Sequence, residues 1–448
     1  MYYNDTIRTG AHSSLYANVL SLGNTAALTP GGCELYNFTA QPSLFQCAAS
    51  AIMTANPALF PALILAVNGV NGGHLAPNAA GDGQQSDRWR VNTESVALFT
   101  HNVLSITDQL ELTFGLRYSE ETKQLGASLA ATSPSCLTLR QMELATAPLM
   151  GGAGIVSALQ SPMFGASSLM NLSCNPAVNT IANGSWAGER DEGEFSGTLS
   201  LGYHVTDDIF VFGGYSRGYK AGGYNTDRSG FQMTPATTSQ AQLNINQVAF
   251  DPEFTDAYEF GFKSTILGGT STFNVTAFYQ QIGDYQLNAF NGFNFITRNI
   301  PEVISQGAEI EFNSRPTDNL TLNLGVVYTD AYFDSTVVFN PLNPGPNTVR
   351  AGEPLAFSAE WVVTGGIGYT QPIGDNLQLT AYVDGRWSGE YQTQTLARNP
   401  ITDQDAFAVF NGRLGLGGQD GRWSVEFWGQ NLTDEFYYVG SFSPPLQD

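Results

Sequence analysis

Charged residues are scarce in this chain of 448 residues: Asp, Glu, Lys and Arg together make up 13%. A soluble protein usually carries about 25%. The sequence also lacks the runs of about 20 apolar residues that membrane-spanning helices need. Its longest apolar stretch, residues 58–67, is too short to span and contains Pro61. Composition therefore argues against both an ordinary soluble domain and a helical membrane protein.

Basic residues are fewer than acidic ones: the chain has 18 Lys and Arg and 40 Asp and Glu, which gives a formal net charge of −22. No basic stripe exists to neutralise phosphates, which excludes nucleic acid as a partner. The phosphate-loop, zinc-protease and serine-hydrolase motifs are missing too. The few histidines are scattered: His12, His74, His101 and His204. We therefore expect no enzyme, no catalytic or metal site and no cofactor.

A signal peptide is also missing, since residues 1–5 form neither a basic start nor an apolar core. We expect the N-terminus of the natural protein to lie upstream. The four cysteines fall in two local couples, Cys33 with Cys47 and Cys136 with Cys174. Local, even pairing favours two disulfides within loops in an oxidising compartment, and the alternative is four unpaired thiols.

Glycine (48 residues) and aromatics (12%) are abundant, and the main pattern is an alternation of apolar and polar residues. It is clearest over residues 110–119, 320–329 and 377–387. Because successive side chains of a strand point to opposite faces, each segment would form a strand with one apolar and one polar face. A soluble β-sandwich would show the same alternation.

The connections between the strands distinguish a soluble β-sandwich from a membrane barrel. Tight polar turns are predicted at residues 107–109, 206–208, 267–269, 317–319, 374–376 and 418–421. Long connections are predicted at roughly 10–88, 125–190, 224–253, 286–296, 335–355 and 393–404. Short and long alternate, as do the periplasmic turns and extracellular loops of an outer-membrane barrel.

About thirteen strands can be counted, near residues 1–9, 89–106, 109–124, 191–205, 209–222, 254–266, 270–285, 297–315, 320–334, 356–372, 377–392, 405–417 and 422–438. Bacterial barrels usually have an even number. We therefore expect an all-β, antiparallel, up-and-down transmembrane barrel that is incomplete. Residues 1–448 would form one partial barrel domain, with 10–88 and 125–190 as large extracellular loops.

Five segments resemble the TonB-dependent outer-membrane receptors, in the order in which that family has them. They are residues 215–225 (YSRGYKAGGYN), 252–263 (PE, then YEFGFK), 278–285 (FYQQIGDY), 306–311 (QGAEIE) and 431–437 (NLTDEFY). The resemblance covers about residues 89–440. It implies a barrel of 22 strands with a plugged lumen, of which about 13 are present here. Eight strands, the closing strand, the plug domain and the TonB box would be missing.

The resemblance also implies function and partners. The parent would be an active-transport receptor in the bacterial outer membrane for a scarce, bulky nutrient of siderophore, cobalamin or glycan type. Its partners would be outer-membrane lipid, its own plug domain, a small-molecule ligand, and the TonB–ExbB–ExbD complex through the missing N-terminus. The main alternative is a passive porin-like channel. An enzyme embedded in a barrel would need a nucleophile and a base that the sequence does not offer.

Several charged residues at strand positions would face the lumen by parity: Glu259, Lys263, Glu309, Glu311, Asp384 and Arg386. They would either contact a plug or solute, or form salt bridges across the barrel wall. Their apolar neighbours would face lipid, because charge on that face is costly. Aromatic residues near strand ends would form the interfacial girdles: Trp361, Trp387, Tyr391, Tyr437 and Tyr438.

Overall fold

The computed structural model describes most of the chain. The described residues are 2–10, 62–63, 65–66, 69–70, 85–131, 135–152, 154, 180–231, 239–290, 295–338, 348–396, 401 and 403–441. Side chains of residues 2–10 and of parts of 135–139 are not described.

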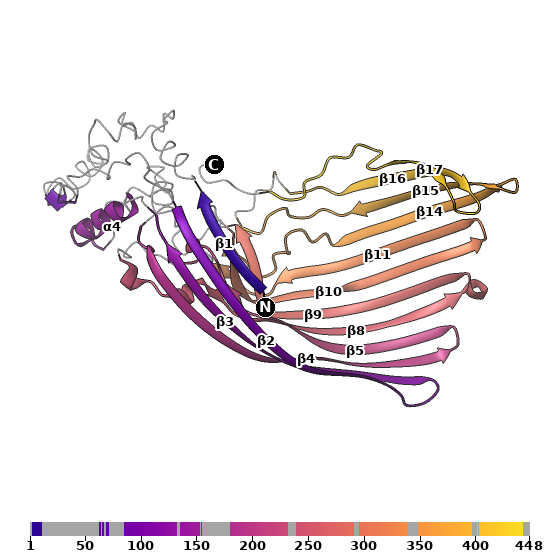
Figure 1. The fold of residues 1–448 in the computed structure, drawn as a ribbon, viewed down its shortest axis with the longest axis horizontal. Coiled ribbons are helices and arrows are strands. Elements are labelled where there is room, and N and C mark those ends of the chain that lie inside the picture. The colour runs from indigo at the N-terminus through magenta and orange to yellow at the C-terminus, as the bar shows by residue number, and fades with distance from the viewer. Residues whose placement is uncertain are drawn as a thin grey trace.

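Thirteen strands form one antiparallel sheet in which each strand pairs with the next along the chain (Figure 1). The strands are β1 (Tyr2–Gly10), β2 (Gln85–Ser105), β3 (Leu110–Leu129), β4 (Gly184–Thr206), β5 (Ile209–Lys220), β8 (Glu253–Ile266), β9 (Ser271–Phe290), β10 (Phe295–Thr317), β11 (Leu320–Phe333), β14 (Trp361–Ile373), β15 (Leu377–Ser388), β16 (Phe407–Gly418) and β17 (Ser424–Gly429). The sheet is open between β1 and β17. The all-β antiparallel fold and the strand count are confirmed.

Long strands are a feature of this sheet: β3 has 20 residues, and β4 and β10 have 23 each. About ten residues suffice to cross a membrane, so these strands extend well beyond it. In Figure 1 the short turns lie at one end of the sheet, while α4 (Ser135–Thr146) lies at the other end. Apart from the short connection between β9 and β10, loop length is therefore segregated by end, as the sequence predicted.

Several predicted boundaries were wrong. β4, expected from residue 191, begins at Gly184, and β14, expected from residue 356, begins at Trp361. The long connection expected at 286–296 spans only residues 291–294 between strands, because β9 and β10 continue pairing up to Phe290 and Phe295. Short and long connections therefore do not alternate without exception. The last strand, expected at 422–438, ends at Gly429. Beyond it the chain has positive φ at Asn431 and Asp434, and among the described residues it makes no further strand pairs with β16.

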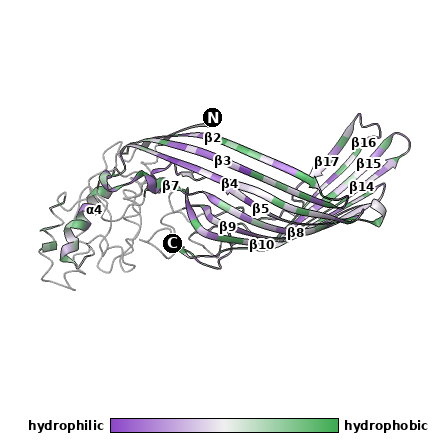
Figure 2. Ribbon diagram, turned by 90° about the horizontal axis from the view of Figure 1, so that it is seen from below, coloured by the Kyte–Doolittle hydropathy of each residue, from purple (hydrophilic) through white to green (hydrophobic). Residues whose placement is uncertain are grey.

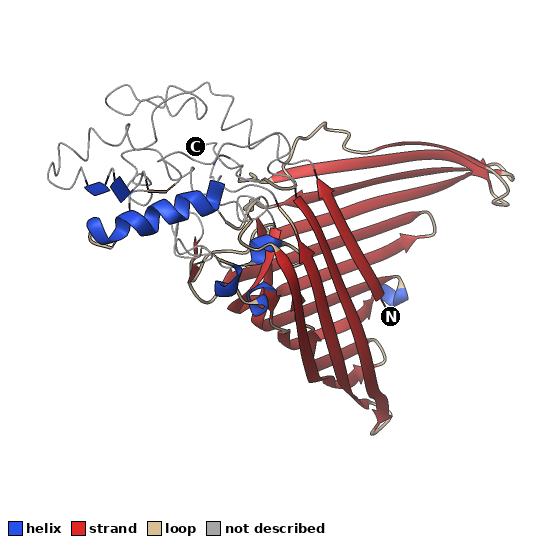
Figure 3. Ribbon diagram, turned by 60° about the vertical axis from the view of Figure 1, so that its left-hand side comes forward, coloured by secondary structure: helices blue, strands red, loops and turns tan. Residues whose placement is uncertain are grey.

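The loop end contains small elements of its own. Two short hairpins lie there, β6 (Gly223–Tyr224) with β7 (Ala249–Phe250) and β12 (Val337–Val338) with β13 (Thr348–Val349). Figure 3 shows α4 and several short 3₁₀ helices gathered at this end of the sheet.

Alternating hydropathy is visible along the ribbons in Figure 2. The apolar side chains of the sheet are not packed into a core between two layers. Many apolar side chains are exposed; Leu98, Phe260 and Phe427 are exposed by 80%, 67% and 75%. Buried apolar clusters instead lie where the loops meet the strand ends. This arrangement suits a sheet whose apolar face contacts lipid.

Among the described residues, no helix is long and apolar enough to cross a membrane.

Candidate functional site: the polar face and the loop end

The strand register places all six predicted charged residues on one face of the sheet. Directly paired residues lie on the same face, and one row crosses six strands: Lys263, Asn274, Glu311, Gly325, Thr364 and Arg386. Glu259, Glu309 and Asp384 lie an even number of residues from members of this row and share its face. That this face lines the lumen stays a prediction.

These charged side chains have few partners within the sheet. Glu311 accepts a hydrogen bond from Asn274 (3.4 Å), and Asp384 accepts one from Asn411 (2.8 Å). Lys263 lies over the ring of Phe212, 5.6 Å from its centroid. No ion pair joins any of the six to another described residue. The predicted salt bridges across the wall are therefore not seen in the described part of the chain.

Aromatic side chains also lie on this face, which the alternation alone did not predict. Phe210 stacks with Phe212 at 6.2 Å and contacts His204 at 4.8 Å. Phe278 pairs directly with Glu259. Phe278 also packs over Gly307, and a Cβ added to Gly307 would lie 2.8 Å from its ring. The middle rows of the polar face therefore carry both polar and aromatic side chains.

The opposite face carries rows of apolar and aromatic residues. Tyr215, Tyr258 and Tyr279 form one row across three strands, with ring centroids 5.1 and 6.4 Å apart. Next to it, on the same face, Arg217 and Asp256 form an ion pair at 2.8 Å. The apolar and aromatic rows of this face thus give way to charge just beyond the tyrosines, which is the pattern expected at a membrane interface.

The five aromatic residues predicted for the girdles divide into two groups. Trp361 and Trp387 lie near strand ends on the apolar face, where Trp361 contacts Tyr328 at 4.8 Å. Tyr391, Tyr437 and Tyr438 lie outside the strands. There Tyr437 stacks on Phe407 at 4.4 Å, and the Tyr391 hydroxyl donates to the Tyr438 carbonyl (2.7 Å).

The described parts of the connection between β5 and β8, residues 221–231 and 239–252, fold onto the polar face of β2, β3 and β4. Its Tyr224, Phe231, Leu243 and Val248 pack against the strand residues Trp89, Leu125, Ala127 and Leu129. Phe231 lies 4.7 Å from the ring of Trp186. Burial here raises the pKa of the Tyr224 hydroxyl. Along residues 184–195 of β4, the side chains on this face are half-buried, whereas those on the other face are exposed.

A buried ion pair fixes this connection to the wall. Arg228 donates to Asp87 at 2.6 and 2.9 Å, and the two side chains are exposed by 0% and 1%. Arg228 also contacts Asn183, whose amide pairs with the backbone of Ala131 in both directions. Paired charges with additional hydrogen bonds are tolerated in such burial.

The base of the connection is held by a second charged group. The Glu192 carboxylate accepts from the Tyr219 hydroxyl and from the backbone N–H of Gly222, both at 3.0 Å. Lys123 donates to the Gly222 carbonyl (2.6 Å), and Arg190 donates to the Phe250 carbonyl (2.6 Å). Both ends of the connection are therefore anchored on β3 and β4.

Three amide side chains then join the connection to the β9–β10 hairpin. Gln286 donates to the carbonyls of Ala221 and Asp251 at 2.9 and 3.0 Å. Asn299 donates to Asp251 and Asp284 at 2.9 and 2.7 Å and accepts from the Asp251 N–H. Asp284 has a φ of 51°, and the pairing of β9 with β10 skips this residue. The hairpin is therefore held against the connection at Gln286 and Asn299.

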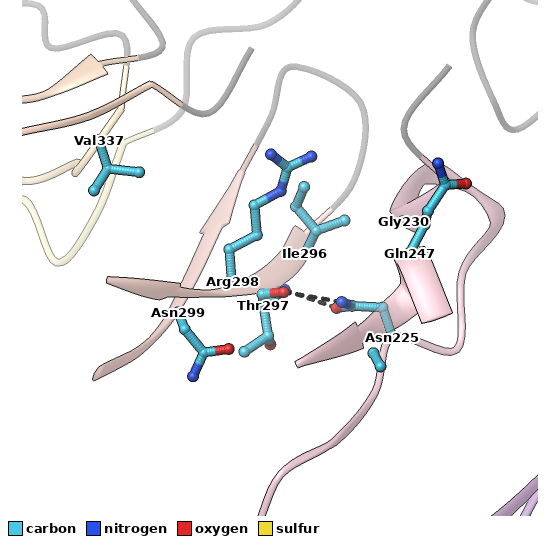
Figure 4. Close-up of a pocket in the computed structure, with 9 residues that line it drawn as sticks. Asn225, Gly230, Gln247, Ile296, Thr297, Arg298, Asn299 and Val337 are labelled. Atoms are coloured by element: carbon cyan, nitrogen blue, oxygen red, sulfur yellow. Dashed lines mark hydrogen bonds between the residues drawn. The ribbon is translucent and has the colours of Figure 1, made fainter. Parts of the chain in front are cut away.

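The third amide, Asn225, borders a pocket of about 270 Å³ (Figure 4). Asn225 accepts from the Thr297 N–H (2.7 Å) and donates to its carbonyl (2.9 Å). Arg298 and Gln247 also line this space. This pocket could not be predicted from the sequence, because its two walls lie on segments about 50 residues apart or more.

The predicted disulfides stay predictions. Cys33, Cys47 and Cys174 lie outside the described residues, and Cys136 lies in α4 with its side chain not described. Elsewhere in α4, Arg140 and Glu143 are buried, and burial lowers the pKa of Arg140 to about 10.

A family model described as TonB dependent receptor-like, beta-barrel, matches residues 65–432. Among solved structures, the ferric yersiniabactin uptake receptor FyuA from Yersinia pestis has 16% identity and a TM-score of 0.55; the match covers 80% of this chain and 43% of that one. The siderophore receptor PiuA from Acinetobacter baumannii has 13% identity and a TM-score of 0.51, covering 79% and 41%. The ferric-catecholate import receptor Fiu from E. coli K12, in its closed form, has 14% identity and a TM-score of 0.50, covering 82% and 44%.

At these identities the likeness to solved structures concerns the fold, and this chain spans less than half the length of each relative. The family model, in contrast, matches most of the chain, from the loop before β2 to the end of the sheet. This chain therefore belongs to the TonB-dependent receptor family, as part of the β-barrel of a receptor in the bacterial outer membrane, and it is not an enzyme.

Proposed function

We propose that the full-length protein captures a scarce, bulky nutrient at its extracellular loops and imports it with energy delivered through TonB. The observation that carries this proposal is the match of the family model to residues 65–432. The ligand would be of siderophore, cobalamin or glycan type. Siderophores are the first class to test, because PiuA is a siderophore receptor and FyuA is an uptake receptor for ferric yersiniabactin.

The polar face is consistent with a lumen that holds a plug. Glu259, Lys263, Glu309 and Arg386 have no ionic partner among the described residues of the sheet. Charged groups in a confined space favour partners of opposite charge, and a plug domain in the full-length protein would supply them. TonB–ExbB–ExbD would then act through a segment outside this chain.

Uptake in paired strains tests the proposal. The full-length receptor is expressed in cells with and without functional TonB, and accumulation of ferric siderophores, cobalamin and oligosaccharides is measured. We expect accumulation of one ligand only when TonB is functional. Equal accumulation in both strains would favour a passive channel and would contradict the proposal.

A further inference from the structure

The connection between β5 and β8 leaves the sheet and returns to it as one closed unit. Its two ends pair in the β6–β7 hairpin, and the Asn225 N–H donates to the Val248 carbonyl (2.7 Å) just beyond it. A Cβ added to Gly222 would lie 2.6 Å from the Phe250 carbonyl oxygen, and one added to Gly223 would lie 2.8 Å from the Phe250 ring. The two glycines therefore allow the ends of the connection to pack directly against each other.

From this hairpin the connection runs along the polar face of β4. Glu192 and Arg190 bond to its base. Gly188 lies beneath its next residues: an added Cβ would lie 3.4 Å from the Tyr224 hydroxyl oxygen and 3.5 Å from Cγ1 of Ile245. The three positions on β4 are two residues apart, so they lie on the same face of the strand. The connection therefore follows β4 closely and does not touch it at one point only.

These contacts distinguish the connection from a mobile lid. Segments that open easily have few buried apolar contacts and have hydrogen bonds exposed to solvent. Here Phe231, Leu243 and Val248 are exposed by only 2%, 9% and 0%, and the ion pair of Asp87 with Arg228 is buried as well. Opening would expose the apolar surface to water and would separate two buried charges, and both changes are costly.

We propose that the described parts of this connection, residues 221–231 and 239–252, are a permanent lining of the extracellular mouth of the receptor. They stay seated on β2, β3 and β4 while the ligand is captured, and they do not close over it as a lid. On this side of the mouth the ligand therefore meets the connection and not the wall strands. This inference rests on the proposed function, in which the polar face lines the passage through the receptor.

Cysteine labelling tests the contact in the purified full-length receptor. Gly188→Cys places a thiol beneath Tyr224 and Ile245, whereas Gly126→Cys places one on the opposite face of the neighbouring strand, with nothing within 4 Å of its Cβ. We expect maleimide to label Gly188→Cys at least about tenfold more slowly than Gly126→Cys, because the connection must open first. Ile245→Cys reports the same contact from the other side and should also be labelled slowly.

The unaltered receptor gives the background labelling of the natural cysteines. Unchanged heat-modifiable migration shows that each variant is folded.

A disulfide lock tests whether the connection must move during transport. A Cβ at position 188 would lie 3.5 and 3.6 Å from the two γ-carbons of Ile245, which is close enough for a disulfide in the double variant Gly188→Cys with Ile245→Cys. Cells expressing the full-length double variant are oxidised, and accumulation of ferric siderophores, cobalamin and oligosaccharides is measured before and after reduction. We expect the locked receptor to accumulate the same ligand at the same rate as the unaltered receptor and the two single variants, treated alike.

Four results would overturn the inference. Labelling of Gly188→Cys as fast as that of Gly126→Cys, or protection that is lost when the siderophores, cobalamin or oligosaccharides are added, would mean that the connection is not permanently seated. Accumulation that stops in the oxidised double variant and returns on reduction would mean that the connection moves as a lid. A folded double variant that forms no disulfide would show that the two positions are not in contact.

The labelling result does not depend on transport, because it uses purified receptor. Failure of the proposed function would instead appear as equal uptake by the unaltered receptor with and without TonB.

Discussion

Asp87 and Arg228 carry full charges at positions almost closed to solvent, exposed by 1% and 0%. A buried pair of this kind adds little net stability, but removing one partner leaves an uncompensated charge. We predict that Asp87→Ala destabilises the β5–β8 connection by about 3–5 kcal/mol. Faster amide hydrogen exchange in residues 221–252 of the full-length receptor, with the barrel still folded, is the expected result.

The exposed pair Arg350 with Glu353 (3.1 Å) provides the control. Arg350→Gln should change local stability by about 0–1 kcal/mol, as is usual for surface pairs. Equal protection of residues 221–252 in Asp87→Ala and in the unaltered protein would show that the ion pair does not hold the connection.

Within the QGAEIE segment at residues 306–311, the glycine at position 307 is required by close packing. A Cβ at this position would overlap the backbone carbonyl oxygen of Tyr328 and lie 2.8 Å from the Phe278 ring. Backbone atoms of a central strand cannot move aside cheaply. We predict that Gly307→Ala prevents normal barrel assembly, seen as loss of the heat-modifiable folded form. Gly283→Ala should assemble normally, because nothing lies within 4 Å of an added Cβ there.

At the residue scale, the sequence predicts the face of the sheet on which a side chain lies better than it predicts which residue that side chain contacts. Alternation alone was enough to place Glu259, Lys263 and Arg386 on one face, because strand geometry leaves two choices. The pair Asp87 with Arg228 could not be predicted, since its members are 141 residues apart in the sequence. The residues that line the pocket were missed for the same reason: they meet only when loops and strand ends come together.

At the scale of elements, strand cores were predictable and strand ends were not. β8 was expected at 254–266 and spans Glu253–Ile266. β9 was expected to end at Tyr285, yet it continues to Phe290. The extension depends on contacts from outside the strand, namely Gln286 and Asn299 bonded to the β5–β8 connection. Local alternation carries no information about such contacts.

The two faces of β8 and β9 allow a matched test of which side contacts lipid. Phe262 lies in the middle of the apolar rows, and Phe278 lies on the opposite face beside Glu259. We predict that Phe262→Arg costs about 2–4 kcal/mol through exposure of charge to hydrocarbon. Phe278→Arg should be tolerated, because it would face the Glu259 carboxylate.

The yield of folded full-length receptor in isolated outer membranes measures both effects. A large loss for Phe262→Arg with a small loss for Phe278→Arg is expected. The reverse order would mean that the polar face contacts lipid, and it would overturn the orientation proposed for Glu259, Lys263, Glu309, Glu311, Asp384 and Arg386.

At the scale of the whole molecule, the sheet has two free edges, on β1 and β17. In water, unpaired backbone groups of an edge strand are hydrated, but in hydrocarbon each one costs several kcal/mol. β17 pairs with β16 over six residues, from Gly412 with Gly429 to Gly417 with Ser424, and no strand among the described residues pairs with its other side. Closure therefore requires strands that pair with both edges.

We predict that residues 1–448, expressed alone, do not insert into membranes as a closed and functional barrel. The apolar face favours insertion, since Phe260, Leu414 and Phe427 are exposed by 67%, 51% and 75%. The two edges oppose it, because bare strand edges are not tolerated against lipid and instead promote pairing between chains. The expected product is aggregated protein with strand content and no heat-modifiable migration. A folded, membrane-inserted monomer of these residues would contradict the prediction, because it would require β1 and β17 to find each other across a sheet that the structure leaves open.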